Sequence, residues 1–178
     1  LLSEGAPEFD LERLRYQHFI QRLEQEYPAY HEIKHRPFNV LPSREIWKNM
    51  ATDAAIVEYF MGREHLYIFV ITPQNGLNMF RQALPTDFLG ICRQLRAMAE
   101  NTDSAEGLSA YPALANVAYE VLLKQALLAL PPATRRLCIV PEGGLSGLPF
   151  DILPTRPVTA WQGTQTPILL NRFALSHT

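Results

Sequence analysis

The sequence has few of the features that direct a chain to a membrane, to nucleic acid or to an oxidising compartment. Only two of its 178 residues are cysteine, and 16 basic against 18 acidic side chains leave a net charge of −2. Two cysteines do not make the disulfide framework of a small secreted domain, and the balanced charge provides no basic face for nucleic acid. No apolar run approaches the roughly 20 residues of a membrane-spanning helix. We therefore expect a soluble, cytoplasmic protein that binds neither membrane nor nucleic acid directly.

The patterns of common phosphate, dinucleotide and metal sites are also missing. Gly143, Gly144 and Gly147 follow an apolar run, but no lysine and hydroxyl complete a phosphate loop, and the spacing differs from a dinucleotide fingerprint. His31 and His35 stand one helical turn apart, yet no acidic or cysteine ligand follows at a metal-site interval. We interpret these histidines as solvated residues at a helix end, and we expect neither a metal nor a cofactor.

Neither cysteine has the sequence surroundings of a nucleophile. Cys92 lies beside the apolar stripe of a predicted helix and Cys138 lies inside an apolar run, so both are typical of buried, inert core residues. Ser146 lacks the glycine spacing of a nucleophile elbow and is interpreted as a turn residue. His177 is the histidine nearest to an expected strand end, but the sequence indicates no partner for it. We assign no catalytic residue.

The 47% hydrophobic content is enough to bury the core of one domain with a helical appendage. Apolar residues recur at three- and four-residue steps from Leu11 to Tyr27, with charged residues between them, which predicts an amphipathic helix ended or kinked by Pro28. We assign residues 1–36 to this helical segment, which is of the kind that ends an upstream helical array. Residues 37–178 form the second domain.

Three strands are expected next, after a short helix at residues 45–50. Residues 54–60 and 65–72 are strand candidates, and the second is apolar on both faces, as a central strand is. Asn75-Gly76 is a strong signal for a hairpin with a primed turn. Residues 77–83 then return as the third strand of an antiparallel meander.

Two helices and a buried parallel strand complete the expected α/β sheet. A helix opens at Pro85 and Asp87, a loop covers residues 101–109, and a second long helix opens at Tyr111-Pro112. Residues 137–140 are the parallel strand. Beyond residue 151 the chain is rich in loops, and residues 168–170 and 173–176 predict a short hairpin or one bent strand.

A glycine-rich turn ends the strand at residues 137–140. Open α/β sheets bind their ligands at the carboxyl ends of such strands, and the glycines allow the chain to double back toward the layer below. The residues that build the turn and its return are Pro141, Gly143, Gly144, Leu148, Pro149 and Phe150.

Four blocks of sequence, in this order, resemble the opening half of a CHAT domain. This caspase-like family is often found behind tetratricopeptide repeats in bacteria. The resemblance covers nearly the whole chain, and its most specific part is the order of the blocks. The blocks are residues 23–30, residues 54–60 with Gly62 and 66–72, residues 139–143 with 148–151, and residues 169–176.

The resemblance implies a caspase-like layered sheet related to separase and gingipain-type cysteine proteases, with this chain as the leading, non-catalytic half. The family's catalytic histidine, in a His-Gly motif, and its catalytic cysteine follow the block that here ends at Ser176, and no residue of this sequence matches either. Glu142 stands where the family usually has aspartate, and an extra glycine follows.

The implied function is that of the structural and regulatory half of a cysteine endopeptidase that cleaves a protein target when a partner activates it. Its partners would be the downstream catalytic half, upstream helical repeats and the protein substrate. One alternative is a catalytically inactive scaffold for protein–protein interaction. Another is a ligand-binding α/β module that uses the glycine turn.

Overall fold

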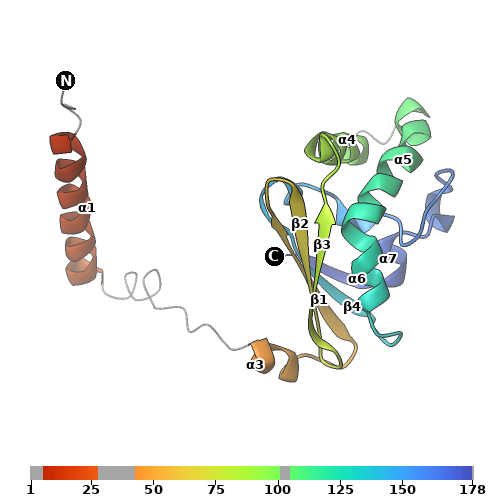
Figure 1. Cartoon of the computed structure of the whole chain (residues 1–178), viewed down its shortest axis with the longest axis horizontal. Helices are drawn as coiled ribbons and strands as arrows, with labels where there is room; N and C mark the ends of the chain where they lie inside the picture. The colour runs from red at the N-terminus through yellow and green to blue at the C-terminus, as the bar shows by residue number, and fades with distance from the viewer. Residues whose placement is uncertain (1–5, 28–42, 101–104, 178) are drawn as a thin grey trace. The chain divides into compact units, whose positions relative to one another are not determined.

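The computed structural model of the chain describes residues 6–27, 43–100 and 105–177 (Figure 1). The chain divides into two compact units, Leu1–Val40 and Leu41–Thr178, and each is described by itself. The first unit contains α1 (Ala6–Glu26), which confirms the predicted helix and begins five residues before Leu11. Its end at Glu26 agrees with Pro28, because the residue before a proline is biased away from helical angles. Leu14, Tyr16 and Phe19 are exposed on it.

The second unit is built on one mixed five-stranded sheet. The strand order is β3-β2-β1-β4-β5, in which β1, β2 and β3 form the predicted antiparallel meander. β4 lies parallel to β1, and β5 lies parallel to β4. The α/β class, the meander and the parallel strand are therefore confirmed. The strands are β1 (Ala54–Met61), β2 (His65–Thr72), β3 (Gly76–Ala83), β4 (Arg136–Val140) and β5 (Ala174–His177).

Helices cover one face of this sheet. Figure 1 shows α5, α6 and α7 together on the same side of the strands. Alternate strand residues point to opposite faces, and the buried ones, such as Val57, Ile68 and Ile139, form one core with the helices. We call this the covered face. The helices of the unit are α3 (Ser43–Lys48), α4 (Phe88–Glu100), α5 (Ala105–Ala118), the π-helix η1 (Tyr119–Leu123), α6 (Lys124–Ala129) and α7 (Leu169–Arg172).

The opposite face, which we call the open face, lies outside that core. Cross-strand register aligns its residues in rows, among them Met79, Phe69, Glu58 and Val140 across four strands. Of the residues that the structure describes, none on this face belongs to the core cluster of the covered face, although Ile71 is itself buried. Its residues include Ile56, Glu58, Phe60, His65, Tyr67, Phe69, Ile71, Leu77, Met79, Arg81, Arg136, Cys138 and Val140.

A single π turn interrupts the long helix that runs from α5 into α6. The Tyr59 hydroxyl donates a hydrogen bond to the Leu122 carbonyl in this turn at 3.2 Å. Tyr59 and Leu122 are both fully buried, and burial raises the pKa of Tyr59 well above its ordinary value. The π turn therefore provides an acceptor for a phenol in the middle of the core.

Three local predictions are corrected. Gly76 has φ of 66° while Asn75 stays at negative φ, so the turn between β2 and β3 is not the primed type. The Asn75 backbone N–H donates to the Thr72 hydroxyl instead, at 3.1 Å. The loop predicted at residues 101–109 is helical from residue 105 on, since α5 begins at Ala105 and includes Pro112. Residues 101–104 lie outside the described residues. The predicted terminal hairpin is a helical turn, α7, followed by β5, which pairs with β4.

Candidate functional site

The carboxyl ends of β1, β4 and β5 meet at one edge of the sheet, where the glycine-rich turn lies. β4 ends at Val140, and the chain passes through the 3₁₀ turn η2 (Gly143–Leu145) before returning to the core. Phe150 is fully buried and stacks on Tyr59 with 5.5 Å between ring centroids. Leu148 is also buried and Pro149 is half-buried, so the return segment lies against the layer below.

The glycine-rich turn lies close to α4. Gly143 has φ of 54°, a left-handed conformation that favours glycine. A Cβ atom at Gly144 would lie 2.5 Å from a methyl carbon of Leu89, and one at Gly147 would lie 2.5 Å from a guanidinium nitrogen of Arg96. Both contacts involve the far ends of exposed side chains of α4, which can move aside, so α4 lies close to the turn without requiring glycine at either position.

Glu142 joins the ends of the two central parallel strands. Its carboxylate oxygen Oε2 accepts a hydrogen bond from the backbone N–H of Met61, at the end of β1, at 2.8 Å. The carboxylate is exposed on its other side. A backbone donor that would otherwise face solvent at this edge is therefore satisfied.

His177 ends β5 and has a carboxylate partner that the sequence did not indicate. Its ring nitrogen Nε2 lies 3.5 Å from Asp151 Oδ1, and its ring centroid lies 6.3 Å from that of Phe150. The side chains of His177 and Asp151 are 38% and 43% exposed. The sequence signal that could have indicated this partner is the position of Asp151. It directly follows Phe150, and the burial of Phe150 places Asp151 at the carboxyl edge of the sheet.

A cleft of about 480 Å³ opens between the β1–β2 turn and the loop that leads from β3 into α4. Arg63, Glu64 and Asp87 line it together with apolar residues such as Phe88 and Met61. Asp87 has φ of 53° and accepts a hydrogen bond from the Gly90 N–H at 3.2 Å, so it caps α4 in a left-handed conformation that aspartate adopts at modest cost. The sequence predicts Asp87 at a helix start and contains no signal for the cleft.

Neither cysteine lies in a nucleophile's environment. Cys92 is buried in the core, and burial raises the pKa of its thiol to about 11. Cys138 is half-buried on the open face, less covered than predicted because the helices lie over the other face. Ser146 is exposed in the turn.

Within residues 6–27, 43–100 and 105–177, no group of three or more metal-ligating side chains is placed to hold an ion. His31 and His35 lie outside the described residues.

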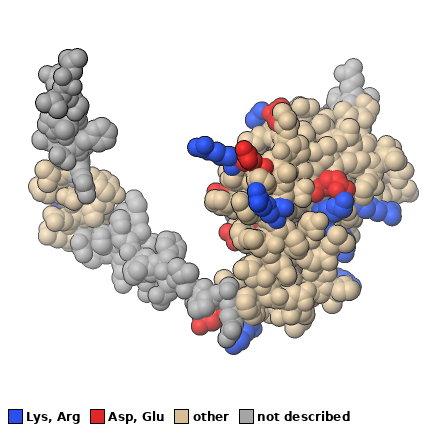
Figure 2. Space-filling model, viewed as in Figure 1, with Lys and Arg blue, Asp and Glu red and all other residues tan. Residues whose placement is uncertain are grey.

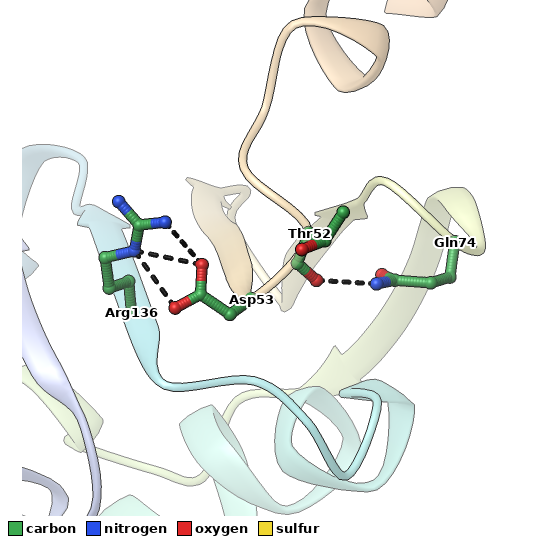
Figure 3. A network of polar contacts seen from close by, with 4 residues as sticks. All are labelled: Thr52, Asp53, Gln74 and Arg136. Carbon is green, nitrogen blue, oxygen red and sulfur yellow. Dashed lines mark hydrogen bonds and ion pairs between the residues drawn. The ribbon is translucent and has the colours of Figure 1, made fainter.

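The opposite, amino edge of β1 and β4 carries a denser polar network (Figure 3). Arg136 forms a bidentate ion pair with Asp53, and its Nε lies 3.1 Å from Asp53 Oδ1. The hydrogen bond from Arg136 and its charge hold the pKa of Asp53 below its ordinary value. Nearby, Gln74 Nε2 donates to the Thr52 carbonyl at 2.6 Å. On the face shown in Figure 2, acidic and basic side chains of the described residues lie close to one another.

The fold defines an α/β protein with a mixed sheet whose parallel strands end at one edge. Comparison with protein-family models found no match, and comparison with curated proteins found none either. No helix in the part of the chain that the structure describes is long and apolar enough to cross a bilayer.

Proposed function

We propose that this chain is the leading, non-catalytic half of a caspase-like cysteine peptidase domain of the CHAT family. It acts in the cytoplasm and supplies part of the sheet against which a catalytic half assembles. The observation that carries the proposal is the open edge of β5, a strand that continues the parallel run β1-β4-β5 and is paired on one side only among the described residues.

The backbone of β5 has donors and acceptors ready for a further strand. The Ala174 N–H donates to the Arg135 carbonyl at 2.8 Å, so it points toward β4. Since successive residues of a strand direct their backbone groups to opposite sides, the N–H groups of Leu175 and His177 point outward. An unpaired row of this kind is a template for strand addition.

The carboxyl edge would then continue into the added strands. A peptidase of this class uses a histidine to deprotonate a cysteine, and the thiolate attacks the peptide carbonyl. In our proposal both groups belong to the downstream half, which would place them at strand ends beside His177 and the Glu142 turn. The role of the present residues is to position that half.

Regulation is assigned to the first unit. α1 is an exposed helix, which suits the last helix of an upstream repeat array. Binding of a partner to such an array would reach the peptidase domain through α1. The protein substrate would contact the downstream half.

The test compares two substitutions at Leu175 in the complete gene product. Leu175→Pro removes the outward N–H without removing a hydrogen bond to β4, whereas Leu175→Ala shortens the side chain and keeps the N–H. We expect a cysteine-directed peptidase probe to label the wild type and the alanine variant but not the proline variant. Circular dichroism checks that all three are folded.

Two results would overturn the proposal. Equal labelling of the folded proline and alanine variants would show that no strand adds to β5. A complete gene product in which the probe labels no cysteine would favour the alternative, a catalytically inactive interaction scaffold.

A further inference from the structure

The open face of the sheet carries large apolar side chains in contact with solvent. Phe60, Leu77 and Met79 are 52%, 44% and 59% exposed. They come from β1 and β3, and between these strands Tyr67 and Phe69 of β2 are half-buried. The Phe60 and Tyr67 rings are neighbours, with centroids 6.2 Å apart. Contiguous apolar exposure of this kind marks an interaction surface.

A single carboxylate lies in the middle of this surface. Glu58 is exposed on β1, and the register places Phe69 of β2 on one side of it and Val140 of β4 on the other. Among the residues that the structure describes, no hydrogen bond or ion pair engages the Glu58 side chain. Its nearest neighbours across the strands are thus apolar.

Neither of the two arginines that the structure describes on the open face is paired with Glu58. Arg81 Nη2 donates to a ring nitrogen of His65 at 2.9 Å, and Arg136, at the amino edge, is paired with Asp53. Among the described residues, Glu58 is therefore an unpaired negative charge within an apolar patch. A molecule that covers the patch must either bring a positive charge to pair with Glu58 or leave its carboxylate buried without a partner. Leaving a charge buried and unpaired is strongly unfavourable.

From these observations we infer that the open face binds an amphipathic helix of another protein, one whose apolar stripe contains a lysine or arginine near its middle. A helix is the element that covers a twisted sheet face in layered α/β folds. Its basic residue pairs with Glu58, while apolar residues one turn before and after it contact Phe60, Phe69 and Met79. Two copies of this chain packed directly over Glu58 would bring like charges together.

This surface is distinct from the strand edge used in the proposed function. The edge is the backbone of β5, whereas the helix site consists of side chains of β1, β2 and β3. Leu175→Pro is therefore not expected to affect helix binding, and the two proposals can fail independently.

The test uses two synthetic helical peptides of 18 residues with the same leucine stripe, one with lysine and one with glutamate at its centre. We expect the full chain to bind the lysine peptide tighter by roughly threefold to tenfold, measured by fluorescence anisotropy. Glu58→Lys should reverse this preference. Glu120→Lys, on η1 and outside the open face, changes the net charge equally and should leave the preference intact.

Three outcomes would overturn the inference. The first is equal affinity for the two peptides, and the second is a preference that survives Glu58→Lys. The third is reversible dimerisation in sedimentation experiments that Met79→Asp abolishes, because a second copy would then be the occupant of the face. Thermal unfolding of each variant checks that a loss of binding is not a loss of fold.

Discussion

The two edges of the parallel strands use polar residues in different ways. At the amino edge, Asp53 and Arg136 satisfy each other in a bidentate pair between the starts of β1 and β4. At the carboxyl edge, His177 and Asp151 approach only to 3.5 Å, and Arg63 faces a cleft with no ion pair among the described residues. The pair at the amino edge fixes the positions of β1 and β4 relative to each other. The looser contacts at the carboxyl edge leave its polar side chains free to bind other groups.

The difference shows where the fold concentrates its local support. The carboxyl edge rests on buried aromatic packing beneath it, from Phe150 and Tyr59, rather than on ion pairs. Exposed ion pairs contribute little to stability, and buried aromatic side chains contribute much more. Because buried aromatic packing stabilises the carboxyl edge, the polar side chains there can be exposed to solvent without being needed for the stability of the fold.

The largest effect is expected from removing that support. Phe150→Ala deletes a fully buried ring and should lower the free energy of unfolding by about 3–5 kcal/mol. Urea denaturation followed by circular dichroism measures it. Leu128→Ala, at a position that is 74% exposed, is the control and should change stability by less than about 0.5 kcal/mol. Similar values for the two variants would contradict the role assigned to the Phe150–Tyr59 stack.

A smaller, pH-dependent effect is expected at the amino edge. Because Arg136 lowers the folded pKa of Asp53 below the ordinary 3.8, the pair stabilises the fold above that pH, and this contribution is lost as the pH falls through the folded pKa. Arg136→Gln should therefore destabilise the protein at neutral pH and have little effect in strong acid. Urea unfolding at about pH 7 and at about pH 1, below both the unfolded and the folded pKa, gives the comparison. A destabilisation that is the same at both would show that the pair's charge is not responsible.

The smallest effect is expected for the looser pair at the carboxyl edge. Asp151→Asn removes the charge beside His177, and both side chains are more than one-third exposed. The free energy of unfolding should change by less than about 0.5 kcal/mol. If chemical denaturation instead gave a loss as large as that for Phe150→Ala, the two edges would not differ in the way described.

Much of the fold follows from local patterns in the sequence. Residues of β2 are apolar on both faces of the strand, which predicts its position inside the sheet. The proline and glycine residues indicate where most turns lie. The parallel strand at residues 137–140 is also indicated, since Pro141 and the glycines end an apolar run abruptly.

What escaped prediction depends on tertiary contacts. The π turn at Tyr119–Leu123 accompanies a hydrogen bond from Tyr59, 63 positions away from Leu122. The sequence predicts a helix start at Tyr111-Pro112, but Pro112 lies inside α5. At the candidate site, the contacts of Glu142 with Met61 and of His177 with Asp151 cross between strands or layers. No local pattern specifies which residue stands opposite another at a sheet edge.

The position of β1 between β2 and β4 has a consequence for how the chain folds during synthesis. β2 follows β1 directly and pairs with it through a short turn, whereas Arg136 of β4 lies 83 positions after Asp53. Contacts this distant form late. Until residues 136–140 leave the ribosome, β1 is an edge strand with an unpaired backbone, and nascent chains are open to mispairing with one another at that edge.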